Sequence, residues 1–161
     1  MQAEEMTAQW RVEEQASRPR RGALLQPPID DALDFVPIRM APGEAVFQGR
    51  PQRSHYTPLG TVHGGWFAAL LDAAVGCAIH TTLPTGKGFT VLKLKLNLMR
   101  PLNDRVSMVR AEGKVIHAGC QAVTAEGRVV GLDGKLYAQA TTTCLIFDVP
   151  ARTERSSHEQ T

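Results

Sequence analysis

The stretch GGWFAALLDAAVGCAIHTTL, residues 64–83, decides the fold of this 161-residue chain. It is rich in Ala and Leu, lacks proline, and places apolar residues on nearly every face of a helix. A helix that is apolar all round is expected to be buried rather than to lie on a surface. Pro84, Gly86 and Gly88 then end it. We therefore predict one long buried helix at the centre of the fold.

Strand patterns surround this helix. In residues 90–99, TVLKLKLNLM, Leu alternates with Lys or Asn, which is typical of a strand with one wet face. Strands and helices do not alternate along the chain, so a doubly wound parallel sheet is disfavoured. We expect an α+β fold in which an antiparallel sheet wraps around one long central helix. The other expected strands span about residues 35–40, 44–51, 105–117, 120–131 and 136–147, the last two joined by an Asp-Gly turn.

The amino-acid composition limits the classes of protein to which this chain can belong. Hydrophobic residues make up 43% and charged residues 21%, enough for one core, which we place at residues 23–149. Residues 1–22 are expected to form a flexible N-terminal arm, either without regular structure or with a short helix around Trp10, and residues 150–161 a flexible C-terminal tail. A net charge of +2 gives no reason to expect a nucleic-acid partner, and no apolar run is long enough for a membrane span.

The N-terminal residues and the cysteines indicate where in the cell the protein is expected. The N-terminal residues lack the charge and apolar pattern of a signal peptide. The three cysteines form no CxxC pair, and the histidines have no metal-ligand spacing. We therefore expect a cytoplasmic protein without a disulfide framework or a metal site.

Asp72 is the one residue in the helix that conflicts with its surroundings. It is the only formally charged residue between Arg53 and Lys87, and it lies mid-helix among Ala and Leu. An unpaired carboxylate buried in such surroundings costs several kcal/mol. A functional carboxylate explains this better than the alternative, in which Asp72 lies on a solvent-exposed stripe of the helix.

A second candidate feature is the glycine pair that opens the helix. His63, Gly64 and Gly65 lead into it, and glycines there leave backbone N–H groups approachable, as in an oxyanion hole. A plain glycine-rich turn is the alternative. Gly65 and Asp72 are about 10 Å apart along one helix, too far to meet on one carbonyl. We expect a symmetric homodimer that brings the helix start of one subunit to Asp72 of the other.

Four segments together resemble a known family: HYTPLGTVHGGWFAALLDAAVG, TVLKLKLNLMRP, VIHAG and DGKLYAQATTTCLIF. They are similar to the PaaI-type hotdog thioesterases, which include phenylacetyl-CoA and 4-hydroxybenzoyl-CoA thioesterases. The resemblance covers about residues 36–148. It implies a hotdog fold that pairs into dimers and often tetramers. It also implies hydrolysis of an acyl-CoA to a free acid and coenzyme A, with coenzyme A as part of the substrate and no separate cofactor.

The resemblance also implies roles for the helix residues. Asp72 would be the catalytic carboxylate, as general base or as nucleophile. The Gly65 N–H would polarise the thioester carbonyl, beside the motif residues His63 and Gly64. Thr90 matches a hydroxyl position that orients water in some relatives.

Substrate-binding residues are less well defined by the motif. Thr57 stands where relatives commonly have Asn or Gln, which puts rate and substrate choice in question. Arg100 is a candidate for a coenzyme A phosphate or for an interface. Four aromatic residues are candidates to line a pocket for an aromatic acyl group, with simple packing as the alternative: Tyr56, Trp66, Phe67 and Phe89. A non-catalytic acyl-CoA-binding protein is the alternative function on this fold. An acyl-CoA dehydratase is disfavoured, because hotdog dehydratases place a His and an acid at a different spacing from HGG followed by Asp72.

Overall fold

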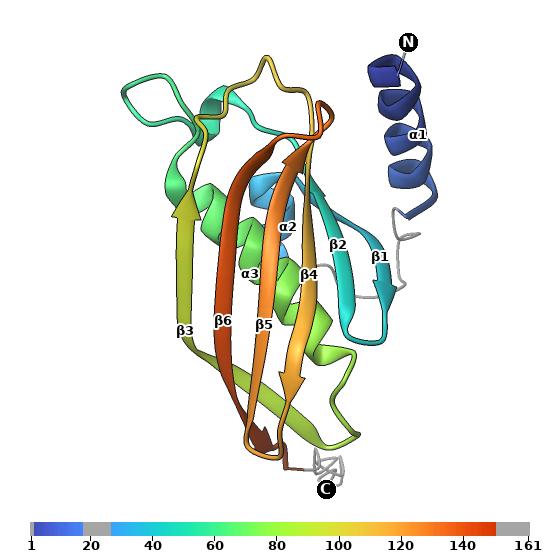
Figure 1. Ribbon diagram of the computed structural model, residues 1–161, viewed down its shortest axis with the longest axis vertical. Coiled ribbons are helices and arrows are strands. Elements are labelled where there is room, and N and C mark those ends of the chain that lie inside the picture. Colours follow the sequence, from blue (N-terminus) through green and yellow to red (C-terminus); the bar gives the residue numbers. More distant parts are fainter. Residues whose placement is uncertain (1, 18–26, 151–161) are drawn as a thin grey trace, which may run out of the picture.

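The computed structural model describes residues 2–17 and 27–150 and consists of one curved sheet with a long helix across one face (Figure 1). The helices and strands follow the expected order, with two helices added before the first strand. Their bounds are α1 Gln2–Ser17, α2 Pro28–Leu33, β1 Phe35–Ala41, β2 Glu44–Gly49, α3 Gly64–His80, β3 Lys87–Leu98, β4 Val109–Ala118, β5 Ala122–Gly131 and β6 Leu136–Asp148, with a 3-10 turn, η1, at Arg53–His55.

The six strands form a single antiparallel sheet in the order β1-β2-β4-β5-β6-β3. This confirms the expected sheet around a central helix, which is the hotdog architecture. β3 pairs with β6 along nearly its whole length, from Lys87 opposite Asp148 to Leu98 opposite Ala138. Its other side is an edge of the sheet. The fold therefore ends on a long edge strand that lies beside α3.

The core lies between α3 and the sheet. Eight α3 side chains are buried, and they include Trp66, Phe67, Leu70 and Leu71. Each large apolar side chain buried in this way stabilises the fold by about 1.5–3 kcal/mol. A Cβ added to Gly113 of β4 would lie 2.5 Å from the Ala74 carbonyl oxygen, so glycine allows the helix backbone to approach the sheet directly.

The N-terminal segment contains a helix around Trp10. Gln2–Ser17 form α1, and Trp10 is only 8% exposed. The Arg110 guanidinium of β4 lies 4.2 Å from the centre of the Trp10 ring and 2.7 Å from a Glu13 carboxylate oxygen. The contact between the buried Trp10 ring and the Arg110 cation holds α1 against β4. The net charge of the segment does not predict this contact. Residues 18–22 and 151–161 of the expected arm and tail lie outside the described part of the chain.

Two further expectations concern absences. No helix in the described ranges is both long enough and apolar enough to cross a bilayer. Within the same ranges, no three His, Cys, Asp or Glu side chains gather as metal ligands would.

Candidate active site

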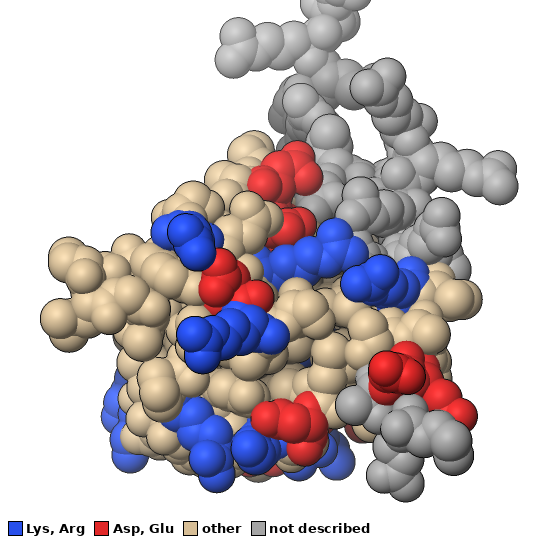
Figure 2. All heavy atoms as spheres, turned by 90° about the horizontal axis from the view of Figure 1, so that it is seen from above, with Lys and Arg blue, Asp and Glu red and all other residues tan. Residues whose placement is uncertain are grey.

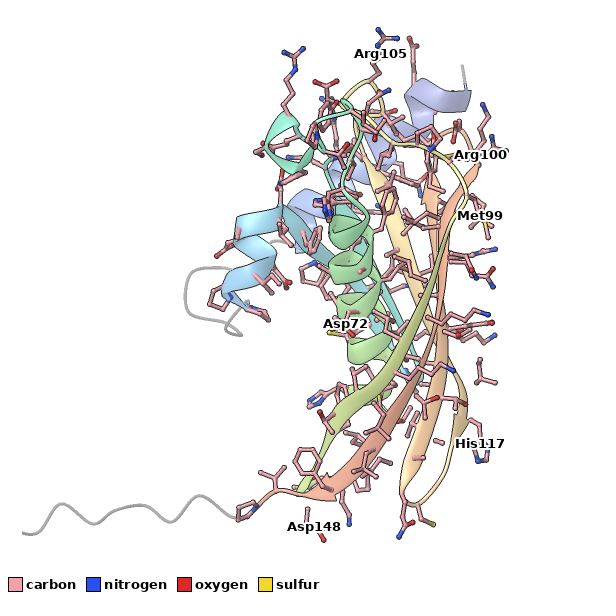
Figure 3. The ribbon with its side chains drawn as sticks, turned by 90° about the vertical axis from the view of Figure 1, so that its left-hand side faces the viewer. Asp72, Met99, Arg100, Arg105, His117 and Asp148 are labelled. Carbon is pink, nitrogen blue, oxygen red and sulfur yellow. The ribbon has the colours of Figure 1, made fainter. Side chains whose placement is uncertain are left out.

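Asp72 lies in the middle of α3, half-buried (Figure 3). Across residues 2–17 and 27–150, its carboxylate has no hydrogen bond and no ion pair. Burial raises the pKa of Asp72, and no nearby cation counters this. The carboxylate is thus partly removed from water without the partner that normally compensates for desolvation.

The side of α3 that carries Asp72 faces the β3–β6 edge of the sheet. Gly76 follows one turn later, and the Phe89 ring of β3 lies beside it. The charge of Asp72 contributes, after burial, to the raised pKa of the Cys144 thiol on β6. Cys144 pairs in register with Val91 of β3. Asp72 is therefore next to apolar parts of the two strands at the open edge.

A second carboxyl with a raised pKa lies on α2. Asp30 of α2 is 4% exposed, and burial raises its pKa. Burial, followed by the charges of Asp30 and Asp72, raises the pKa of Cys77 to about 11. The thiol is therefore protonated at neutral pH. No sequence pattern indicates Asp30, because its short helix has no apolar periodicity.

The helix start is capped by its own histidine. His63 is the N-cap of α3, and its Nδ1 accepts a hydrogen bond of 2.8 Å from the Gly65 N–H. An accepting Nδ1 leaves the ring proton on Nε2. Within the described chain, the Gly64 N–H has no hydrogen-bond acceptor. The donors free at this end are therefore the Gly64 N–H and the His63 Nε2–H, whereas the Gly65 N–H is already occupied.

Thr57 is engaged within its own loop. Its N–H donates to the Thr61 carbonyl at 2.7 Å, and its hydroxyl accepts from the Leu59 N–H at 3.3 Å. The same hydroxyl lies 3.5 Å from the Thr61 hydroxyl. Thr57 thus closes the turn before His63, and the structure gives it a local role where an amide side chain was expected in relatives.

Trp66 belongs to the core and not to an open pocket. It is 3% exposed, its ring contacts Phe35, His55 and Phe67, and its Nε1–H donates to the Leu33 carbonyl at 3.1 Å. This bond ties α2 to the start of α3, and Figure 3 shows α2 beside α3 on the side away from the sheet. The structure therefore favours the packing alternative for Trp66.

Thr90 and Arg100 lie away from Asp72. Phe89 faces α3, so the exposed Thr90 that follows it on the strand faces the opposite side of the sheet. Arg100 follows β3, and Figure 3 shows it with Met99 toward the upper end, beyond Asp72. Basic and acidic side chains are interspersed on that end of the molecule (Figure 2). The structure brings together the residues of α3 and its cap, but it does not bring Thr90 or Arg100 to them.

Comparison with protein families and solved structures identifies the family to which this chain belongs. The thioesterase superfamily matches residues 59–138, which include His63 and Asp72. A point mutant of the phenylacetic acid degradation protein PaaI of Thermus thermophilus is 32% identical, with a TM-score of 0.66 over 73% of this chain and 97% of that one. This chain belongs to the thioesterase superfamily. Its PaaI-like hotdog fold confirms the resemblance found in the sequence.

Two other solved structures are similar to this chain. The TT0310 protein of Thermus thermophilus is 31% identical, with a TM-score of 0.68 over 75% of this chain and 98% of that one. The phenylacetic acid degradation-related protein of Ralstonia eutropha JMP134 is 27% identical, with a TM-score of 0.71 over 78% and 94%. No curated protein matches this chain. The comparisons thus show the family and the fold.

Proposed function

We propose that this thioesterase-family protein hydrolyses an acyl-CoA to a free acid and coenzyme A, with Asp72 as the catalytic carboxylate. The observation that carries the proposal is the state of Asp72, which is half-buried and without a partner in the described chain. Burial raises its pKa, which suits a group that exchanges a proton with water. The free donors at the start of the same helix supply the complementary half of the chemistry.

A second copy of the chain is needed to bring the Asp72 carboxylate and the free donors at the start of α3 to the same carbonyl group. The Gly64 N–H and Asp72 are about 12 Å apart along α3, so one subunit does not present both to one carbonyl. The edge strand β3 carries exposed apolar side chains, with Leu92 62% and Leu98 53% exposed. Antiparallel pairing of β3 with β3 of a second copy would cover this edge and continue the sheet. A two-fold axis there would turn the helix start of each subunit toward Asp72 of the other.

The reaction then needs few groups, because a thioester is already activated. The Asp72 carboxylate takes a proton from water as the water oxygen attacks the carbonyl carbon. The partner's Gly64 N–H and the partner's His63 Nε2–H stabilise the resulting oxyanion. Collapse of the intermediate breaks the C–S bond, and the proton passes to the departing thiolate. In the alternative course Asp72 attacks the carbon itself, and water then hydrolyses the mixed anhydride.

Replacing Asp72 by Asn tests the proposal. Thiol release should fall at least 100-fold with every acyl-CoA that the parent hydrolyses, because the amide can neither take the proton nor attack. Asp31→Asn is the matched control, since Asp31 is an exposed carboxylate of α2. Equal thiol release by the parent and Asp72→Asn would refute the role of Asp72.

One observation favours a second candidate, an acyl-CoA-binding protein without catalysis. The Gly65 N–H, expected to polarise the carbonyl, is occupied by His63. Saturable acyl-CoA binding by a parent protein that releases no thiol from any acyl-CoA would establish this alternative.

A further inference from the structure

Gly76 is a glycine that the chain itself does not require. It lies in the interior of α3, where glycine is less favourable than any residue except proline. It does not adopt a positive φ angle. A Cβ added there would meet only the Phe89 ring, at 3.5 and 3.8 Å, which is ordinary van der Waals contact. Neither backbone conformation nor packing in the described chain excludes alanine at this position.

The glycines that pack against α3 from the sheet behave differently. A Cβ on Gly113 would lie 2.5 Å from the Ala74 carbonyl oxygen, and a Cβ on Gly127 would lie 2.9 Å from a Val75 methyl group. Those glycines are required because the sheet approaches the helix closely there. Gly76 has no such close neighbour. Packing within the subunit therefore does not explain why this position is a glycine.

Gly76, the position without a side chain, lies one helical turn after Asp72. Residues four apart on a helix lie on the same face, about 6 Å along the axis. Phe89 of β3, which is half-buried, and Val91, which is 37% exposed, face α3 at this level. We call Gly76, Phe89 and Val91 the Gly76 surface. It is apolar, it adjoins the carboxylate, and it lies at the open edge of the sheet.

We propose that the Gly76 surface receives the acyl group of the thioester, and that Gly76 is a specificity-determining residue that admits a ring or a branch close to the carbonyl carbon. The inference rests on the proposed function. If Asp72 acts on the carbonyl carbon, the second and third acyl carbons lie within about one helical turn of it. Bare helix backbone at Gly76 and the Phe89 ring then provide an apolar contact.

A methyl group added at position 76 should lower kcat/KM more for ring-bearing or branched acyl groups than for straight ones. Gly76→Ala should lower kcat/KM for benzoyl-CoA and isobutyryl-CoA at least 10-fold relative to butyryl-CoA, whose straight chain needs less width. Butyryl-CoA is therefore the control within each variant. Thermal melting should show that Gly76→Ala is at least as stable as the parent, since alanine favours the helix. The double variant Gly76→Ala with Phe89→Leu should recover most of the lost ratio, because the smaller side chain at position 89 returns to the acyl group the width that the methyl group takes.

Each other outcome counts against a defined part of the inference. An unchanged ratio of branched to straight substrates in Gly76→Ala, with an active parent, overturns the specificity role and leaves the proposed function intact. An equal loss on all substrates together with a monomeric variant in size-exclusion chromatography also overturns it, because Gly76 would then serve subunit contact. A parent protein that releases thiol from no acyl-CoA overturns the proposed function, and this inference with it.

Discussion

Replacing Asp72 by Asn should make the protein more stable while it removes activity. The Asp72 carboxylate is half-buried and has no hydrogen bond or ion pair in the described ranges. A buried polar group without a partner costs about 1–3 kcal/mol, and partial exposure places Asp72 near the lower end. Neutral asparagine is easier to desolvate than a carboxylate. We expect a gain of about 1 kcal/mol at pH 8, which corresponds to a rise in Tm of about 2–4 °C for a chain of this size.

The gain should depend on pH in a defined direction. Burial raises the pKa of Asp72 above its unfolded value, so the folded state holds a proton at this site more tightly than the unfolded chain does. The destabilisation by the carboxylate is therefore complete above the folded pKa. It disappears as the pH falls below the unfolded pKa of about 4. The difference between parent and Asp72→Asn should consequently shrink from pH 8 to pH 4.

Urea denaturation at both pH values measures this difference. Asp31→Asn serves as the control, because an exposed carboxylate should leave the free energy of unfolding within about 0.5 kcal/mol of the parent. A variant Asp72→Asn that is less stable than the parent at pH 8 would show that the carboxylate has a stabilising partner. A gain that is equal at pH 8 and pH 4 would contradict the assigned ionisation.

Three shorter predictions follow from the same geometry. The kcat/KM for thiol release should fall as the pH drops through the raised pKa of Asp72, and a profile flat down to pH 4 would contradict a basic role for the carboxylate. Leu92→Asp on the edge strand should convert a dimer into monomers and abolish activity, as measured by size-exclusion chromatography with a thiol-release assay; an active monomer would refute the paired edge. His63→Ala removes the helix cap and should lower the free energy of unfolding by about 1 kcal/mol, and unchanged stability would show that the bond to the Gly65 N–H contributes nothing.

Local patterns predicted the fold well, because period-2 strands and an all-apolar helix are properties of short segments. The sequence placed the first residue of β3 at 90 and a strand start at about 105, whereas the structure has Lys87 and Val109. Residues before Val109 form a turn instead, in which the Val106 N–H donates to the Asn103 carbonyl. The docking of α1 was not predictable from composition, since it depends on Trp10 meeting one arginine of a distant strand.

The candidate site was predicted in part. Asp72 and the His63 cap are visible in sequence because a lone charge and a glycine pair contrast with their neighbours. Side-chain direction is harder to predict. Trp66 is buried along the same helix face as Leu70 and is therefore core, and strand alternation turns Thr90 away from the helix. The occupied Gly65 N–H depends on the rotamer of His63, which no sequence pattern specifies.

The most direct test of a site shared between subunits mixes two inactive chains. One carries Asp72→Asn, and the other carries Gly64→Pro, which removes the free N–H at the first helical position, where proline is well tolerated. Gly64→Ala is the matched control, because it adds a Cβ but keeps the N–H. Random mixed dimers should restore about a quarter of the parent thiol release, since half of the dimers would hold one intact site of two. Mixtures that stay as inactive as either variant alone, although the chains exchange, would contradict a shared site.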